Sequence, residues 1–238
     1  MFNLYSLDID ATFSVAMMAK PYSDRCAAGK ILAQKICALN LQETVLVLAI
    51  PNGGLAVAVP IAETLTADLD LLIVRKLQIP YNPEAGFGAI SSLGTVILNE
   101  PLVAQLRLNQ SQIQSIIQRT KTQIETRQTA YAGLVGQQSP DGRIVILVDD
   151  GLASGYTMLA AIQSVRARGP QKIIVAVPTG SAAAVSRVRD QVDMLICPHV
   201  GSAYVFAVAD AYQNWYDVPE DEVIALLRQF HEKNCETD

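Results

Sequence analysis

The stretch Ile144–Met158, "IVILVDDGLASGYTM", is the part of the sequence that decides the fold. Its first five residues are aliphatic, which is typical of a strand covered on both faces. Two aspartates, Asp149 and Asp150, follow directly, and a run of small residues then leads into a segment with helical spacing. This order predicts a βα unit with carboxylates at the carboxyl end of the strand, where ligands bind in open α/β sheets.

The loop that follows the aspartates has the composition of an anion site. Gly151, Ala153, Ser154 and Gly155 are small enough to let the backbone curl, so that successive N–H groups point inward. The helix behind the loop adds unsatisfied N–H groups and its dipole. Ser154 and Thr157 add hydroxyl donors, and a phosphate monoester fits such a place.

Three familiar small-residue loops do not match this stretch. A Walker loop needs lysine where Tyr156 stands, "GLASG" has its serine one place too late for a nucleophile elbow, and the dinucleotide fingerprint is absent. Carboxylates directly beside a phosphate would repel it. They make sense if they hold sugar hydroxyls or a divalent cation between themselves and the phosphate.

The rest of the chain alternates between predicted strands and helices, which indicates βαβ units and a parallel sheet. We expect an open, mostly parallel sheet flanked by helices. The other predicted strands are Thr44–Ile50, Asp70–Leu77, 172–178 and 193–198. The predicted helices are Asp24–Asn40, 55–65, 155–168, 181–191 and 219–233.

Two internal segments depart from this alternation. "KLQIPYNPEAGFG", 76–88, holds two prolines and two glycines and reads as a mobile lid, followed by a hairpin that turns at Ser92–Gly94. Residues 101–133 are polar with helical spacing. We therefore expect an N-terminal arm, 1–21, and a single domain, 22–238, with a helical insertion at about 100–133 and a hood and helix at about 198–233.

Composition excludes several classes of function. The net charge is -5 and no basic run occurs, which argues against a nucleic-acid partner. The four cysteines, Cys26, Cys37, Cys197 and Cys235, form no CxxC pair, and the chain has only two histidines, so we expect no structural zinc site. Scattered cysteines without a secretory signal favour the cytoplasm. No apolar run reaches the ~20 residues that a membrane helix needs.

"VILVDDGLASGYT" resembles the phosphoribosyl-pyrophosphate (PRPP) signature of the type I phosphoribosyltransferases. The blocks "YSDRCAAGKILAQKI", "VLAIPNGGLAVAVPIAETL", "LIVRKLQIPYNPEAGFGAI" and "VFAVADAYQNWYDVPEDEV" are similar to a subgroup of uncharacterised predicted phosphoribosyltransferases, over residues 22 to 230. The resemblance implies an Mg²⁺-dependent enzyme of the type I fold. It would transfer the 5-phosphoribosyl group from PRPP to a nucleobase-like acceptor and release pyrophosphate.

The resemblance also implies roles for individual residues. Asp149 and Asp150 would bind the ribose hydroxyls, directly or through Mg²⁺, and with Lys76 they form the expected catalytic set. The residues expected to cradle the 5-phosphate are Ala153, Ser154, Gly155, Tyr156 and Thr157. The residues expected at the pyrophosphate are Asn52, Gly53, Gly54, Arg75 and Lys76, with a strained or cis peptide in the loop that begins at Pro51. Tyr204 and Phe206 would stack on the acceptor.

Two departures from the wider pattern keep alternatives open. Related proteins often carry arginine where this chain has Asn52, and hypoxanthine–guanine enzymes usually carry aspartate where it has Ala153. The first departure allows a non-catalytic regulator that binds PRPP or a nucleotide, and the second makes a 6-oxopurine acceptor less expected. A sugar-phosphate hydrolase is a weaker alternative.

The resemblance also implies a homodimer, and the polar insertion bears on it. Its helix needs a partner surface for a few apolar residues, either in the same chain or in a second copy. These residues are Ile113, Ile116, Ile117 and Ile124. Near the C-terminus, we expect Tyr212, Trp215 and Tyr216 to pack against the last helix, and we assign no role to His199.

Overall fold

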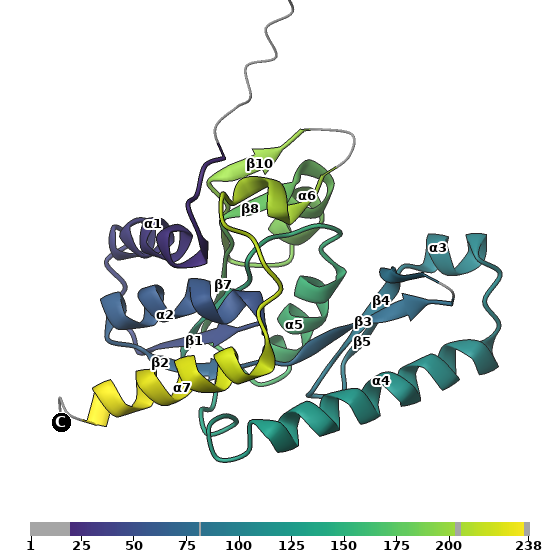
Figure 1. Ribbon diagram of the computed structural model, residues 1–238, viewed down its shortest axis with the longest axis horizontal. Helices are drawn as coiled ribbons and strands as arrows, with labels where there is room; N and C mark the ends of the chain where they lie inside the picture. The colour runs from purple at the N-terminus through teal and green to yellow at the C-terminus, as the bar shows by residue number, and fades with distance from the viewer. Residues whose placement is uncertain (1–19, 81, 203–205, 236–238) are drawn as a thin grey trace, which may run out of the picture.

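The computed structural model describes residues 20–80, 82–202 and 206–235 (Figure 1). Its centre is a five-stranded sheet in the order β2-β1-β6-β7-β9, in which every pairing is parallel. These strands are β1 (Val45–Ala49), β2 (Asp68–Leu71), β6 (Ile144–Val148), β7 (Lys172–Ala176) and β9 (Met194–Ile196). The strand order reverses between β1 and β6, so their carboxyl ends flank the crevice of the sheet. The predicted parallel α/β architecture is confirmed.

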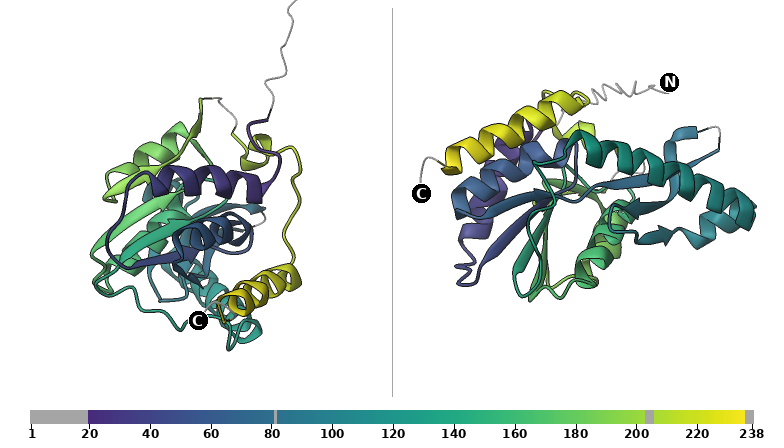
Figure 2. Two further views of the ribbon diagram at one scale, coloured as in Figure 1. Left: turned by 90° about the vertical axis from the view of Figure 1, so that its left-hand side faces the viewer. Right: turned by 90° about the horizontal axis from the view of Figure 1, so that it is seen from below.

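Helices cover both faces of this sheet (Figures 1 and 2). Helices α1 (Arg25–Cys37) and α2 (Gly53–Leu65) lie on one face, and α5 (Tyr156–Arg166) and α6 (Ala182–Arg189) lie on the other. On β6, Ile144, Ile146 and Val148 belong to the core cluster with α1 and α2, whereas Val145 and Leu147 belong to the cluster with α5. Burial on both faces explains why the strand sequence is apolar without alternation.

A second, antiparallel sheet projects to one side of the central sheet (Figure 1). It contains β3 (Val74–Ile79), β4 (Asn82–Ser91) and β5 (Val96–Leu98). The predicted strand Asp70–Leu77 is therefore wrong, because the chain leaves the central sheet after β2 and enters this one as β3. Residues 69–74, on both sides of the break, are all buried, so the apolar run continues across it. The predicted lid 76–88 is instead mostly a β3–β4 hairpin, and the turn at Ser92–Gly94 is confirmed.

The helical insertion consists of α3 (Glu100–Gln105) and α4 (Gln110–Ala130). A capping box between Asn109 and Gln112 starts α4. Ile113, Ile117 and Ile124 are buried in the same core cluster as α1 and α2. The apolar face of the insertion thus finds its partner within the chain, and it no longer argues for a dimer.

The C-terminal third adds a small parallel pair of strands, of which the second falls within the predicted hood at about 198–233 and the first lies before it (Figure 1). The pair is β8 (Thr179–Ser181) and β10 (His199–Gly201). A short 3₁₀ helix, η1 (Val208–Ala211), and a final helix, α7 (Glu220–Cys235), follow. Among the described residues, we find no helix with the length and apolarity needed to span a bilayer.

Asp70 anchors the return of the insertion to the central sheet. Its buried carboxylate accepts hydrogen bonds from the backbone N–H groups of Gly136 (2.8 Å), Gln137 (3.0 Å) and Gln138 (3.2 Å). We predict that Asp70→Ala lowers the free energy of unfolding by about 2–3 kcal/mol, because it removes charged acceptors from several donors. Asp68→Ala on the same strand is the control in urea unfolding. It should cost less than about 1 kcal/mol, since the side chain of Asp68 is 48% exposed and its ion pair with Arg143 lies at the surface end of the strand. Equal losses would contradict the anchor.

Candidate active site

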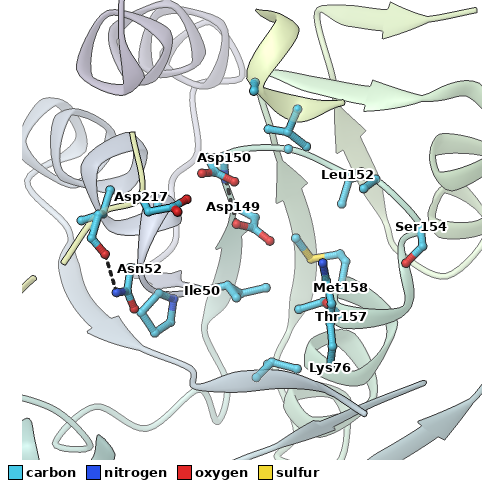
Figure 3. Close-up of a pocket in the computed structure, with 18 of the residues that line it drawn as sticks. Ile50, Asn52, Lys76, Asp149, Asp150, Leu152, Ser154, Thr157, Met158 and Asp217 are labelled. Carbon is cyan, nitrogen blue, oxygen red and sulfur yellow. Dashed lines mark hydrogen bonds between the residues drawn. The ribbon is translucent and has the colours of Figure 1, made fainter. Parts of the chain in front are cut away.

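A cleft of ≈ 1000 Å³ lies at the carboxyl ends of β1 and β6, where the strand order reverses (Figure 3). Six parts of the chain line it: the start of α1, the loop after β1, strand β3, helix α4, the loop after β6 with the start of α5, and the segment 206–218. This is the place where the fold predicts a ligand. Polar groups predominate there, in contrast to the apolar core beneath it.

The aspartate pair forms the floor of the cleft beyond the end of β6 (Figure 3). The Oδ1 atom of Asp149 accepts a hydrogen bond of 2.8 Å from the backbone N–H of Asp150. Burial raises the pKa of Asp149 well above its usual range, and the adjacent Asp150 raises it further. Burial also raises the pKa of Asp150, although its ion pair with Arg25 opposes that shift. Asp149 is thus the carboxylate whose charge is less well compensated in the free protein.

Arg25 holds Asp150 from the start of α1, and the sequence analysis missed it. Its Nε atom lies 2.9 Å from Oδ2 of Asp150, and its side chain is only 6% exposed. The guanidinium carbon lies 4.0 Å from the centre of the Trp215 ring, and Nη1 donates to the carbonyl oxygen of Tyr216. Because its guanidinium stacks on Trp215 and donates two hydrogen bonds, Arg25 fixes the orientation of the Asp150 carboxylate.

The prediction that the aromatic residues near the C-terminus pack against α7 holds for Tyr216, whose hydroxyl donates a 2.7 Å hydrogen bond to Oε1 of Glu222 on that helix. Tyr212 and Trp215 instead belong to a cluster that includes the start of α1. Tyr212 and Trp215 pack together with ring centres 5.4 Å apart, and both face Arg25. The hydroxyl of Tyr212 donates a 2.6 Å hydrogen bond to the carbonyl oxygen of Asp150. Burial raises the pKa of Tyr212, and Asp150 raises it further, so the phenol remains a donor. The aromatic group and Arg25 together support the aspartate pair.

The small-residue loop after the aspartates curves into the start of α5, as predicted. Gly155 adopts a left-handed conformation with φ of 82° at the helix start, which explains the need for glycine there. Hydroxyl Oγ of Ser181 donates to the carbonyl oxygen of Ala153 at 2.7 Å, and Arg187 donates to that of Ser154. These two hydrogen bonds fix the backbone of the loop from the side that faces β8 and α6.

Four of the five residues expected at the 5-phosphate line the cleft. They are Ala153, Ser154, Gly155 and Thr157. Tyr156 differs, since its ring faces the guanidinium of Arg187 at 4.8 Å. The side chain of Tyr156 thus supports the loop from behind, and only its backbone is available to an anion.

The loop after β1 lies against the aspartate pair. The peptide bond between Pro51 and Asn52 is cis, as the family resemblance implied. A Cβ atom at Gly53 would lie 1.9 Å from Oδ2 of Asp150, and one at Gly54 would lie 2.8 Å from the carbonyl oxygen of Val148. The two glycines are therefore required by the close approach of this loop to the end of β6.

Besides Arg25 of α1, which lies beside Gly53, cations near this loop come from two further elements. Arg75 and Lys76 at the start of β3 line the cleft, as expected. Arg127 from α4 also lines it, and its Nη1 atom donates to Oδ1 of Asn52 at 2.9 Å. Nδ2 of Asn52 donates in turn to the carbonyl oxygen of Val218 at 2.6 Å. Asn52 is thus held between the insertion and the segment before α7.

The hood contributes an apolar wall to the cleft. Phe206 lines the cleft and packs closely on Gly201, where a Cβ atom would lie 2.5 Å from the ring. Val208 lines the same wall, and a Cβ atom at Gly151 would meet it at 2.6 Å. Tyr204, the other expected acceptor residue, lies outside the described residues. The position of Phe206 is compatible with its expected role.

Sequence reasoning missed three charged side chains at the cleft, Arg25, Arg127 and Asp217. Asp217 is exposed on the segment before α7 (Figure 3). No single motif identifies any of them. Arg127 follows Ile124 by three residues, which places it toward the buried face of α4, and this spacing was the available signal. Within the described part of the chain, no group of three or more His, Cys, Asp or Glu side chains forms a metal site.

The strand order reverses between β1 and β6, and an acidic pair and two loops of small residues meet at this switch point. These features place the chain among the α/β proteins that bind a ligand at the switch point of the sheet. The family model described as "Phosphoribosyl transferase domain" matches residues 25–214. The chain therefore belongs to the phosphoribosyl transferase domain family, and the resemblance noted in the sequence is confirmed.

Relatives and one solved structure agree with this assignment. The chain is 36% identical over 212 residues to "Putative phosphoribosyl transferase Rv0571c" and to its counterpart "Putative phosphoribosyl transferase MT0597", both from Mycobacterium tuberculosis. The match covers 89% of this chain and 47% of each relative, so the chain spans about half their length. The crystal structure of TT1426 from Thermus thermophilus is 32% identical, with a TM-score of 0.72, covering 88% of this chain and 98% of that one.

Proposed function

We propose that the chain transfers the 5-phosphoribosyl group of PRPP to a nucleobase-like acceptor, with Mg²⁺ bound and pyrophosphate released. One observation carries the proposal: within a single cleft, Asp149 and Asp150 lie between the small-residue loop of α5 and the loop Pro51–Gly54. PRPP has the same order of groups, with its ribose between the 5-phosphate and the pyrophosphate. Each part of the donor thus meets a chemically suited part of the cleft.

The phosphate end of the donor is proposed to bind at 153–157. The first N–H groups of α5 have no partner inside the helix, and the helix dipole favours an anion there. The hydroxyl groups of Ser154 and Thr157 line the same region of the cleft. A monoester dianion would satisfy these donors without any lysine.

The aspartates are proposed to act on the ribose. Bond breaking at C1 leaves positive charge on the sugar ring, as in glycoside cleavage, and a fixed carboxylate stabilises that charge. Asp149 is poorly compensated by cations in the free protein, so its field is available to the sugar. Arg25 keeps Asp150 in one orientation, which limits the reorganisation needed when the donor binds.

The aspartate pair also fits Mg²⁺. This ion is typically held by one or two carboxylates together with waters and substrate phosphates. Asp149 and Asp150 supply such carboxylates, and one oxygen of Asp150 remains after Arg25 has taken the other. When bound, Mg²⁺ would neutralise charge on the leaving pyrophosphate. Arg75 and Lys76 are proposed to face the same group, with Lys76 completing the catalytic set.

The acceptor is proposed to bind against the hood. Phe206 and Val208 form an apolar wall on which a planar base can stack. Ala153 offers no carboxylate to a purine N7 proton, so we place an adenine-like or non-purine acceptor before a 6-oxopurine. Tyr204 is kept in the proposal from the family resemblance alone.

The remaining expectations are proposals of the same kind. We propose one domain over residues 22–238, because the two larger core clusters share the central sheet. We propose a homodimer from the family resemblance. Light scattering after size exclusion tests this proposal, and a monomer at tens of micromolar would contradict it.

We propose a cytoplasmic location, with which free thiols at Cys26, Cys37 and Cys197 are compatible.

A pyrophosphate-release assay with a panel of bases tests the proposal. Wild-type protein with PRPP and Mg²⁺ is expected to release pyrophosphate only when one class of base is present. Protein heated beyond unfolding serves as the control for contaminating hydrolysis. Release of phosphate from simple sugar phosphates without any need for PRPP would instead support a hydrolase.

A second candidate is a regulator that binds PRPP or a nucleotide without turnover. The neutral amide of Asn52 in the loop beside the aspartates favours it, because it brings no positive charge to the leaving group. This candidate predicts PRPP binding with no pyrophosphate release across the whole panel.

A further inference from the structure

Arg127 approaches the loop Pro51–Gly54 from a part of the chain 75 residues away. Its Nη1 atom donates to Oδ1 of Asn52 at 2.9 Å, and both side chains line the cleft. We propose that Arg127 is a donor-binding residue that contacts the pyrophosphate end of PRPP. The inference rests on the proposed function, and it assigns to the helical insertion a part in substrate binding.

The contacts of Arg127 position its guanidinium and leave donors for a ligand. Nε lies 3.7 Å from Oε1 of Glu220, and Nη1 is bonded to Asn52. A guanidinium has five N–H groups in a planar fork, and neither of these described contacts uses Nη2. Its side chain is 25% exposed, so ligand atoms in the cleft can reach it. Asn52 therefore positions the guanidinium of Arg127, which supplies the positive charge that Asn52 itself lacks.

The charges around Arg127 favour a polyanion in this part of the cleft. Arg75 and Lys76 line the same cleft, and Glu220 supplies the carboxylate that contacts Arg127. Burial lowers the pKa of Arg75, and the neighbouring Arg127 lowers it further. An anion that binds both guanidinium groups would offset the repulsion that Arg75 experiences from Arg127. Pyrophosphate is such an anion, and guanidinium groups bind phosphate oxygens in a bidentate manner.

The insertion can hold Arg127 firmly because it is part of the core. Ile117 and Ile124 of α4 are buried, and the connection after α4 is tied to Asp70. A binding group on a helix anchored in this way is placed more accurately than one on a loop. Figure 1 shows α4 running beneath the β3–β4–β5 sheet toward the start of α7. Helix α4 therefore packs against the antiparallel sheet and also contributes a side chain to the cleft.

Calorimetric titration with Mg²⁺-pyrophosphate and, separately, with ribose 5-phosphate tests the inference. Arg127→Met is expected to bind pyrophosphate roughly 10- to 100-fold more weakly, from the loss of charged hydrogen bonds, while ribose 5-phosphate binds as in the wild type. Arg119→Met is the matched control, because Arg119 is exposed on the same helix. It should bind both ligands as the wild type does.

Two further variants separate a binding role from a structural one. Arg127→Lys keeps the charge but not the planar fork, so it should lose less pyrophosphate affinity than Arg127→Met does. Asn52→Arg combined with Arg127→Met returns a cation to the loop and should recover part of the lost affinity. Unchanged pyrophosphate affinity in Arg127→Met, or equal losses for both ligands, would overturn the inference. A wild type that binds neither ligand would instead overturn the proposed function beneath it.

Discussion

Replacing Asp149 by asparagine is expected to abolish donor binding and to make the protein more stable. Its carboxylate is partly buried beside Asp150, and its ionised form is disfavoured in the free protein. Asparagine has the same shape, and its Oδ1 atom can still accept the hydrogen bond from the N–H of Asp150. We expect affinity for PRPP with Mg²⁺ to fall at least ~100-fold, which is typical when a preorganised electrostatic group is lost. Stability should rise by about 1–2 kcal/mol at pH 7.

The pH dependence of that stability gain follows from the direction of the shift. The pKa of Asp149 is raised in the folded state, so the folded protein holds this proton more tightly than the unfolded chain does. The contribution of Asp149 to stability therefore falls as the pH rises through the interval between the two pKa values. The advantage of Asp149→Asn over the wild type should be full above the raised folded-state pKa. It should vanish below the unfolded-state pKa of about 3.9.

Thermal unfolding and calorimetry of the same samples check both parts of this prediction. Asp150→Asn is the informative neighbour, because it leaves the buried guanidinium of Arg25 without its carboxylate. It should lower the melting temperature, whereas Asp149→Asn should raise it. Two adjacent aspartates with the same effect on stability would show that the electrostatic environment described here is wrong.

Replacing Arg25 by methionine is expected to cause a large loss of stability. The guanidinium is 6% exposed and pairs with Asp150, whose side chain is 17% exposed. Removing one partner of a buried ion pair leaves an uncompensated charge, which costs about 3–5 kcal/mol. The stacking of Arg25 on Trp215 is lost as well. Urea unfolding followed by fluorescence measures the loss.

A double-mutant cycle shows whether the ion pair is the cause. Arg25→Met combined with Asp150→Asn should be more stable than Arg25→Met alone, because the unpaired carboxylate is gone. Lys30→Met is the control, since Lys30 is exposed on the same helix, and it should change stability by less than about 0.5 kcal/mol. Additive effects of the two substitutions would contradict a direct interaction.

The sequence predicted those parts of the fold that depend on local pattern. The run Ile144–Val148, its two aspartates and the helix after Gly155 stand as expected, because burial, turn chemistry and helix start are all encoded within a few residues. The break between β2 and β3 was not predictable in this way. Both sides of the break are apolar and buried, so nothing local marks where the chain changes sheets.

The same distinction applies to the cleft. The loops at Asn52 and Asp149 carry sequence motifs, and the structure brings them together at the switch point of the sheet. Arg25 and Arg127 carry no motif, because their positions depend on how α1 and α4 pack against distant segments. Interactions between residues so far apart in sequence are a property of tertiary packing alone.

Calorimetric titration of the wild-type protein with PRPP in the presence of Mg²⁺ tests the central claim most directly. That claim is that the cleft between the loops at Asn52 and Asp149 binds this donor. We predict saturable binding below millimolar PRPP that Asp149→Asn removes while the variant remains folded. Absence of wild-type binding at millimolar PRPP, or equal binding by Asp149→Asn, would contradict it.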